Sequence, residues 1–411
     1  MKIPIGLFEG FGVELEYMIV DKVTLKVRPI TDEVIKEVVG KYVSDYEDEN
    51  IAWSNELVLH VIELKTNGPA KSLNNLDGNF HSHIKQINKI LEKYNCELLP
   101  SGAHPFYDPD TETKLWPHDN NPVYESYNRI FNCRGHGWSN LQSTHINLPF
   151  ANDEEFGRLH AAIRMLLPII PAIAASTPIL DNNYTGFLDS RLEVYRKNQI
   201  KIPSITGKVI PEQVFTQKEY EKFIYEKIYK DIEPYDTENI LQNEWLNSRG
   251  AIARWERNTI EIRVVDIQEC PTADLALVGL FSLLLKELIE EKHISYEEQK
   301  YFHEDELAVI FLNTIKDAEN TLIDNYKYLK AFGLQKSVTG RDLWKHIYQN
   351  INVDSKIISK EKLLPVETIF EHGTLSTRIK STLNSNLSRE NLVNVYKRLS
   401  NALSTNEMFI P

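Results

Sequence analysis

Alternating apolar and polar residues predict β-strands in several parts of the chain, because successive side chains of a strand point to opposite faces. The segments FGVELEYMIVD and LVLHVIELKT show this pattern. A third strand is predicted in LQSTHINLP, and AIARWER and TIEIRVVD are predicted to form a β-hairpin. These predicted strands cover residues 11–21, 57–66, 141–149, 251–257 and 259–266.

Apolar residues spaced three and four apart predict helices between and after the strands. Residues 100–140 are rich in Pro, Gly, Asn, Asp and His, which predicts a long loop, and such a loop in a compact domain usually serves function. Residues 180–215 are predicted to be irregular as well. Because strands and helices are interspersed, the predicted fold class is α+β. The predicted helices cover residues 31–40, 73–95, 153–175, 216–230 and 272–292.

The length and continuity of the chain favour one domain. A chain of 411 residues suits one large domain. No change of composition marks a linker between two parts. We therefore expect residues 1–411 to form a single domain, in which residues 293–411 are the mostly helical C-terminal part.

Charge and hydropathy exclude several classes of partner. The net charge is −13, and no basic stripe of the kind that binds nucleic acid is present in the sequence. The acidic excess either keeps the protein soluble or reflects carboxylates clustered around divalent cations. The most apolar stretches, residues 166–175 and 275–285, are too short to span a bilayer. We expect neither nucleic acid nor a membrane as a partner.

The cysteines favour a reducing compartment. Cys96, Cys133 and Cys270 form no CxxC pair, and their number is odd, so a disulfide framework is not expected. We interpret them as core residues, although one could act as a nucleophile. The N-terminal sequence MKIPIGLFEGFGVELEY lacks the long apolar region of a signal peptide. A cytoplasmic location is therefore expected.

Carboxylates recur on the polar faces of the first two predicted strands. Glu14 and Glu16 are two residues apart and share a face, and Glu63 occupies the polar face of the second strand. Glu56 lies seven residues before Glu63, so a bulge or an irregular entry would be needed to bring both to one site. The alternatives are a solvated pair at Glu14 and Glu16 and a surface position for Glu56.

The later strands add an imidazole, an amide and another acid–base pair to polar faces. The same parity, continued along the last strand, places Val265 rather than Asp266 on the polar face. The alternatives are a histidine satisfied in the core and a common cross-strand ion pair. The side chains on these polar faces are His145, Asn147, Glu261 and Arg263.

A sheet with one aliphatic and one acidic face is costly without counter-ions, and oxygen-rich sites select Mg²⁺ or Mn²⁺. Zinc is disfavoured because no Cys or second His stands at zinc-like spacing. The chain has neither GxxxxGK[ST] nor GxGxxG, so any bound ATP would be held by metals and arginines. Candidate arginines, each with a surface salt bridge as the alternative, are Arg191, Arg196, Arg254, Arg257 and Arg263.

Six blocks together resemble, in the same order, blocks of the glutamate–cysteine ligase family, which includes plant-type and bacterial enzymes and the wider carboxylate–amine ligases. They run through most of the chain. They are FGVELEYMIVD (11–21), ELVLHVIELKTNGP (56–69), LQSTHINLPF (141–150), AASTPILDNNYTGFLDSR (174–191), TIEIRVVDIQECPT (259–272) and HGTLSTRI (372–379).

The resemblance implies a glutamine synthetase-like fold, in which an antiparallel sheet curves around the active site and helices pack on its outer face. Residues 1–411 would then form a single catalytic domain. The implied activity is an ATP-dependent carboxylate–amine ligase of glutathione biosynthesis that uses Mg²⁺, with Mn²⁺ as an alternative. The implied substrates are ATP, glutamate and an amino acid or amine. The implied metal ligands are Glu14, Glu16, Glu56, Glu63, His145 and Glu261.

The resemblance also implies roles for polar residues near the metals. Arg191 and Arg263 would contact the γ-phosphate or an acyl phosphate, and Arg196 and Asn147 would be further nucleotide contacts. Many carboxylate–amine ligases carry a second His at the position of Asn147, so the plant-type and classical bacterial pattern fits better here. Residues 198–245 do not align, and the acceptor amine is expected to be selected there.

The sequence leaves several alternatives open. One is a ligase with another acceptor than cysteine or another carboxylate donor. A second is a phosphotransferase of the guanidino-kinase type, and a third is a non-catalytic binding protein of the same fold. The sequence also leaves a homo-oligomer open.

Overall fold

The computed structural model describes residues 4–411. Within these residues, the centre of the molecule is an eight-stranded antiparallel sheet with the order β2-β3-β4-β1-β6-β10-β9, in which β5 also pairs with the end of β1. The strands are β1 (Gly12–Asp21), β2 (Asp45–Glu47), β3 (Ile51–Asn55), β4 (Val61–Thr66), β5 (Cys96–Leu99), β6 (Ser143–Pro149), β9 (Ala251–Arg254) and β10 (Thr259–Asp266).

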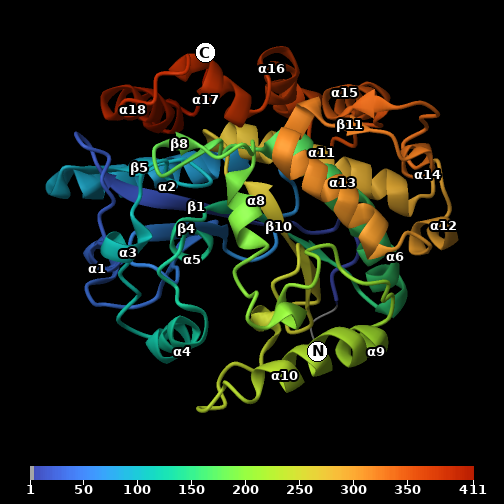
Figure 1. The fold of residues 1–411 in the computed structure, drawn as a ribbon, viewed down its shortest axis with the longest axis horizontal. Helices are drawn as coiled ribbons and strands as arrows, with labels where there is room; N and C mark the ends of the chain where they lie inside the picture. The colour runs from blue at the N-terminus through green and yellow to red at the C-terminus, as the bar shows by residue number, and fades with distance from the viewer. Residues whose placement is uncertain (1–3) are drawn as a thin grey trace.

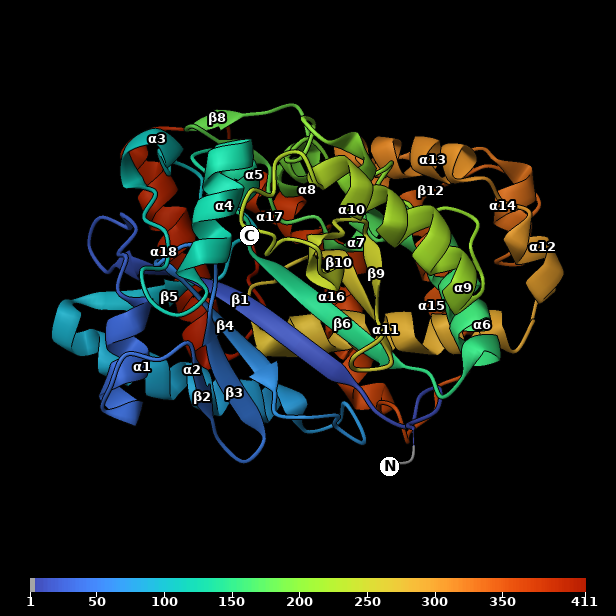
Figure 2. The same cartoon turned by 90° about the horizontal axis from the view of Figure 1, so that it is seen from below.

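One face of this sheet is apolar and packs on long helices. In β1, Val13, Leu15 and Tyr17 alternate with the glutamates and are fully buried in the main core. Figure 2 shows α11 (Pro271–Ile289) crossing behind β1 and β6, with α2 (Leu76–Leu91) beside it. Burial of these apolar side chains leaves the other face of the sheet for polar residues.

The remaining helices surround the sheet (Figure 1), and those of the C-terminal part lie together along one side of it. Two short ribbons, β7 (Ile179–Leu180) with β8 (Asn183–Tyr184) and β11 (Leu322–Ile323) with β12 (Val338–Thr339), complete the strands of the described chain. Besides α2, the α-helices up to residue 232 are α1 (Thr31–Val39), α3 (Pro109–Glu112), α4 (Asn121–Phe131), α5 (His136–Ser139), α6 (Asp153–Leu166), α7 (Pro171–Ala174), α8 (Ser190–Tyr195), α9 (Gln217–Tyr220) and α10 (Glu226–Ile232).

The C-terminal part contains mostly helices, with the β11–β12 ribbon inserted among them. Across residues 4–411, none of the helices has the length and hydrophobicity that crossing a membrane requires. The helices of this part are α12 (Tyr296–Lys300), α13 (Glu304–Asp317), α14 (Tyr326–Lys330), α15 (Gly340–Asn350), α16 (Leu364–His372), α17 (Leu375–Leu383) and α18 (Arg389–Thr405).

The predicted α+β class is confirmed, but several boundaries were wrong. The strand predicted at 57–66 begins only at Val61, and the short strands β2, β3 and β5 were not predicted. The predicted loop 100–140 contains α4, whose first turn carries Pro122. The predicted helix 153–175 is divided because proline lacks the amide hydrogen that an α-helix needs, and Pro168 and Pro171 fall inside that range.

Candidate active site

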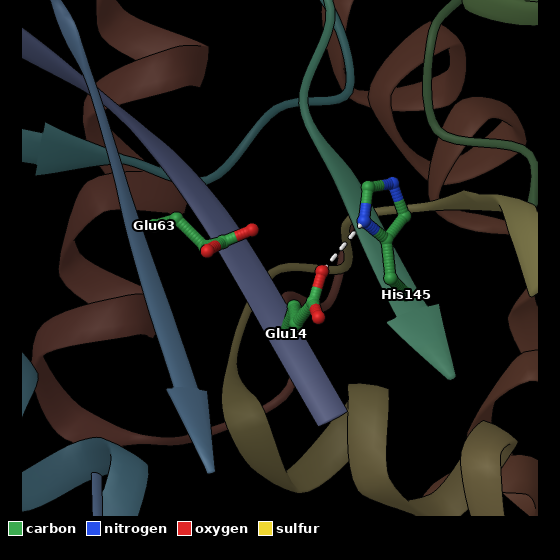
Figure 3. Close-up of side chains that lie close together, drawn as sticks. All are labelled: Glu14, Glu63 and His145. Atoms are coloured by element: carbon green, nitrogen blue, oxygen red, sulfur yellow. Dashed lines mark hydrogen bonds and ion pairs between the residues drawn. The ribbon is translucent and has the colours of Figure 1, made fainter. Parts of the chain in front are cut away.

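The polar face of the sheet is acidic because the strand register brings glutamates together. In the pairing of β1 with β4, Glu16 lies opposite Glu63, and in the pairing of β1 with β6, Glu14 lies opposite His145. Residues directly opposite in an antiparallel pair share a face and lie close together. Figure 3 shows the side chains of Glu14, Glu63 and His145, with a hydrogen bond of 3.0 Å between His145 Nδ1 and Glu14 Oε2.

Within residues 4–411, two groups of side chains are arranged so that they could hold a metal ion. One consists of Glu14, Glu63 and His145, and the other of Glu16, Glu56 and Glu63. In each group the potential ligand atoms lie within 4.8 Å of one another, and Glu63 belongs to both. Carboxylate oxygens with one imidazole suit a hard divalent cation such as Mg²⁺ or Mn²⁺. The side chains therefore fit the metal ions that the sequence suggested.

Glu56 reaches the site because it lies outside the regular strands. Strand β3 ends at Asn55 and β4 begins at Val61, so Glu56 belongs to the irregular connection between them. The alternation of a continuous strand would have placed Glu56 and Glu63 on opposite faces. The irregular entry brings Glu56 beside Glu16 and Glu63.

The carboxylates of the cluster are short of positive charge. Burial raises the pKa of Glu56 well above its ordinary value, and Glu16 and Glu63 raise it further. Burial also raises the pKa of Glu16, an effect that the charge of His145 opposes. For Glu14, burial would raise the pKa, but the hydrogen bond with His145 and the positive charges of His145 and Lys65 together lower it. A divalent cation bound between these carboxylates would compensate their negative charge and would favour their ionised forms.

Strand β6 supplies hydrogen-bond donors that orient the glutamates. The backbone N–H and the hydroxyl of Ser143 donate to Glu16 Oε2 over 2.6 and 2.9 Å. Asn147 Nδ2 donates to Glu14 Oε1 over 3.0 Å. Gly12 lies opposite Asn147, where an added Cβ would come within 2.8 Å of the Asn147 Cβ, so glycine leaves room for this amide. Asn147 thus lies beside the acidic cluster and holds Glu14.

Glu261 lies on the same face but is occupied by arginines. Arg254 Nη1 lies 2.9 Å from Glu261 Oε2, and Arg263 Nε lies 3.0 Å from Glu261 Oε1. Burial would raise the pKa of Glu261, but the positive charges around it, led by Arg263, lower it. Among the described residues, Glu261 is not part of either potential metal group. In the structure, Glu261 binds the guanidinium groups of Arg254 and Arg263.

The parity prediction for the end of β10 was wrong. The register with β6 shifts between Ile262 and Val265, so that Val265 lies opposite Thr144 and Asp266 lies opposite Ser143. A bulge inserts one extra residue and inverts the alternation beyond it. Val265 therefore enters the apolar core, and Asp266 shares the face that carries Ser143.

Asp266 binds Arg191, which projects from α8. Arg191 Nη1 lies 3.3 Å from Asp266 Oδ1, and Arg191 Nη2 donates to the carbonyl oxygen of Arg263 over 2.9 Å. The other carboxylate oxygen of Asp266 accepts hydrogen bonds from Ser176 and Thr177. Arg191 is nearly fully buried and lines a cavity next to the acidic cluster.

Arg196 does not join the other predicted site residues. Its guanidinium forms two hydrogen bonds with Glu193, of 2.7 and 3.1 Å, at the end of α8. It is absent from the lining of the cavities around the acidic cluster that the structure describes. In the structure, Arg196 therefore forms a salt bridge with Glu193, which is the alternative that the sequence left open.

Cavities that share lining residues extend across the polar face. A central cavity of about 310 Å³ contains the acidic cluster. A cavity of about 440 Å³ adjoins it and shares Glu16, Glu56 and His145 with it. This second cavity is also lined by Arg191 and Arg263, and by residues of the unaligned stretch and of the predicted loop, namely Tyr124, Tyr127, Trp138, Asn198, Gln199 and Trp245.

A third cavity, of about 600 Å³, adjoins the central one on another side. It is lined by the segments that enter β1 and leave β4 and by the turn between β9 and β10, and the acidic residues Asp45, Glu47 and Glu256 also face it. These lining residues include Gly10, Phe11, Gly12, Asn67, Gly68, Pro69, Asn147, Pro149 and Asn258.

Sequence reasoning missed Lys65, Ser54 and Ser143. Lys65 Nζ lies 3.2 Å from Glu63 Oε1, and the Ser54 hydroxyl donates to the same oxygen over 2.6 Å. Lys65 could have been found because it is two residues after Glu63 on the same strand face. Ser143 could likewise have been found two residues before His145. Ser54 lies on the unpredicted strand β3.

Known proteins resemble this chain over most of its length. The model of the glutamate-cysteine ligase family 2 matches residues 10–398. An uncharacterized protein of Archaeoglobus fulgidus is 32% identical over 97% of this chain and all of its own length. A putative glutamate–cysteine ligase 2 of Corynebacterium glutamicum is 26% identical over 45% of this chain, and the match spans 46% of that protein.

Among solved structures, the glutamate–cysteine ligase of Francisella tularensis in complex with AMP has the same fold. It superposes with a TM-score of 0.58 over 98% of this chain and 90% of its own, at 13% identity. The expected glutamine synthetase-like fold and the resemblance of the sequence blocks are thereby confirmed. The chain belongs to the glutamate-cysteine ligase family 2 and is an ATP-dependent ligase that forms carbon–nitrogen bonds.

Proposed function

We propose that the protein joins the γ-carboxylate of glutamate to the amine of an amino acid, with cysteine as the principal acceptor, and converts ATP to ADP and phosphate. The observation that supports this most is the acidic cluster at the junction of the cavities. The cavities on either side of it share lining residues with the central one, so a phosphate chain and an amino acid could approach the cluster from different sides. The names of the Corynebacterium and Francisella proteins support glutamate and cysteine as the substrates.

In this proposal, Glu14, Glu16, Glu56, Glu63 and His145 hold Mg²⁺, with Mn²⁺ as a substitute. Bound divalent ions neutralise the charge of the phosphates and of the attacking carboxylate. The potential ligand atoms of these side chains lie within 4.8 Å of one another in each of the two groups. Glu261 is a further candidate ligand, since it lies on the same sheet face and only ion pairs with Arg254 and Arg263 engage it.

The shapes of the flanking cavities suggest which substrate each one takes. The cavity of about 600 Å³ offers apolar residues such as Phe11, Pro69 and Pro149 near the ends of strands, which suits a base and a ribose. The cavity of about 440 Å³ offers Arg191 and Arg263, which suit the carboxylate groups of amino acids. Its aromatic wall, with Tyr127 and Trp138, also admits acceptors bulkier than cysteine.

The chemistry then proceeds in two transfers. A γ-carboxylate oxygen of glutamate attacks the γ-phosphorus of ATP, the bond to the bridging oxygen of ADP breaks, and an acyl phosphate forms. The acceptor amine, after loss of a proton, attacks the acyl carbon, and phosphate leaves with the former carboxylate oxygen. In this proposal, Arg263 and Arg191, which line the cavity of about 440 Å³, stabilise the transferring phosphoryl group and the acyl phosphate.

Isotope transfer tests this sequence of bonds. Glutamate with ¹⁸O in its γ-carboxylate is incubated with ATP, Mg²⁺ and cysteine, and the released phosphate is analysed by mass spectrometry. The proposal requires one ¹⁸O atom in each phosphate and a γ-glutamyl amide as the product. Phosphate without ¹⁸O, or a phosphorylated product without an amide, would contradict it.

A further inference from the structure

The central cavity and the cavity of about 600 Å³ meet at a neck of four charged residues. Glu14, Asp45, Lys65 and Arg257 are the described residues that line both cavities. We refer to these four as the neck. Since the proposed function places the base in one cavity and the γ-phosphate in the other, the rest of the triphosphate has to pass through this neck.

Lys65 forms one side of the neck. It lies opposite Glu14 in the pairing of β1 with β4. Its Nζ lies 2.8 Å from Ser54 Oγ, 3.2 Å from Glu63 Oε1 and 3.4 Å from Asp45 Oδ1. The side chain remains 28% exposed, and Asp45 is more exposed still at 55%. The ammonium group is thus tethered at the boundary of the two cavities but remains open to a ligand.

Arg257 forms the other side of the neck, in the turn between β9 and β10. Its Nη1 lies 3.9 Å from Glu14 Oε1, and its side chain is 53% exposed. The long contact and the exposure show that the guanidinium is only loosely engaged. Glu14 therefore has a cation on either side, one from β4 and one from the hairpin turn.

The other cations near the cluster are held by partners. Arg254 and Arg263 both bind Glu261 at 2.9 and 3.0 Å. Arg191 binds Asp266 and the carbonyl oxygen of Arg263, and it lines the cavity of about 440 Å³ but not the central cavity. A polyphosphate that passes the carboxylates of Glu14 and Asp45 would be repelled unless cations neutralise it. At the neck of the described structure, Lys65 and Arg257 are the residues that can do so.

We propose that Lys65 and Arg257 bind the polyphosphate of the nucleotide at the neck, in place of the glycine-rich loop that this sequence lacks. This inference rests on the proposed function. On nucleotide binding, Lys65 exchanges its contact with Asp45 for a phosphate oxygen, and Arg257 swings from Glu14 to the phosphates. Neither Lys65 nor Arg257 lines the cavity of about 440 Å³ that the proposed function assigns to the amino acids. Binding of the amino acids should therefore not depend on these two side chains.

Binding of ATP and ADP to purified Lys65→Met and Arg257→Met variants, measured by calorimetry with Mg²⁺, tests this inference. Each substitution should weaken the binding of ATP and of ADP by about 10- to 100-fold, since a hydrogen bond to a charged group is lost. The KM for glutamate should stay unchanged while the KM for ATP rises. Lys65→Arg should recover part of the loss.

Lys286 provides the matched control. It is 32% exposed and binds Asp354 at 2.6 Å, remote from the neck, so Lys286→Met removes the same charge at similar burial and should not change ATP binding. Asp45→Asn removes the carboxylate that competes with the phosphates for Lys65, so this variant should bind ATP more tightly. Retention of ATP affinity in both Lys65→Met and Arg257→Met would overturn the inference, as would an equal loss in Lys286→Met. Because these outcomes concern nucleotide binding, they are independent of whether a γ-glutamyl amide is the product.

Discussion

Glu16 and Glu63 lie opposite each other on the neighbouring strands β1 and β4, with both carboxylates buried on the polar face of the sheet. Two buried carboxylates repel each other and are costly unless cations or hydrogen bonds compensate them. Ser143 donates to Glu16, and Ser54 and Lys65 approach Glu63. The sheet thus holds the pair in a fixed orientation, which is what a site for a divalent cation requires.

Replacement of either glutamate by glutamine should abolish turnover but leave the fold intact. The amide keeps the size of the side chain and loses the charge that binds the cation. Loss of one such electrostatic contact typically costs about 3–4 kcal/mol of barrier, or about 10²- to 10³-fold in rate. Steady-state ATP turnover, together with circular dichroism of Glu16→Gln and Glu63→Gln, measures this. Normal turnover in a folded variant would remove that residue from the metal site.

Mg²⁺ or Mn²⁺ should stabilise the native protein against unfolding. A ligand that binds only the folded state adds about 2.7 kcal/mol when its free concentration is about 100 times its Kd. Thermal melting with and without a chelator measures the effect. The double variant Glu16→Gln/Glu63→Gln should show little metal-dependent shift, because one potential group loses Glu63 and the other loses both glutamates. An equal shift in wild type and double variant would place the stabilising metal elsewhere.

Stability should depend on pH through Asp274, which lies in the helix α11 behind the sheet. Burial raises the pKa of Asp274 from 3.8 to about 8. A group whose pKa is raised by folding contributes stability that is complete below about pH 4 and is lost as the pH rises through about 8. Asp274→Asn resembles the protonated acid and keeps acceptors for Thr144 and the Gln268 N–H.

Urea unfolding of Asp274→Asn and of wild type between about pH 4 and about pH 8 tests the direction in which stability changes with pH. The variant should gain stability relative to wild type as the pH rises from 4 toward 8, the pKa to which burial raises Asp274. A difference in stability that is constant over the range, or that grows toward low pH, would contradict the assignment.

Asp266→Asn should be strongly destabilising, because it leaves the buried guanidinium of Arg191 without its carboxylate. Removal of one partner of a buried ion pair typically costs about 3–5 kcal/mol. Glu193→Gln, which removes the partner of the half-exposed Arg196, should cost less than about 1 kcal/mol. Denaturant unfolding of both variants gives the comparison. Similar losses in the two would show that Asp266 does not hold Arg191 as the structure indicates.

Much of the site was predictable because strand parity is a local property. The alternation in β1, β4 and β6 placed Glu14, Glu16, Glu63 and His145 on polar faces before any register was known. The register itself depends on contacts between distant segments. Only the structure shows that Glu16 faces Glu63 and that Glu14 faces His145.

The features that escaped prediction each break a local rule. Asp266 reaches Arg191 through a bulge, and nothing in the TIEIRVVD pattern marks the extra residue. Strand β3 is fully buried, so its residues IAWSN lack the alternation that predicts a half-buried strand. Lys65, in contrast, follows the parity of its strand, but only the register shows that carboxylates of β1, β2 and β4 surround it.

Product analysis with and without Mg²⁺ distinguishes a metal-dependent γ-glutamyl ligase from the alternatives. Purified protein is incubated with ATP, glutamate and a panel of amino acids that includes cysteine and bulkier acceptors, with Mg²⁺ or with a chelator, and the products are identified by mass spectrometry. We expect a γ-glutamyl amide, ADP and phosphate in equal amounts, and only when Mg²⁺ is present. Amide formation that persists in the chelator, or ATP turnover that gives no amide with any amino acid, would contradict it.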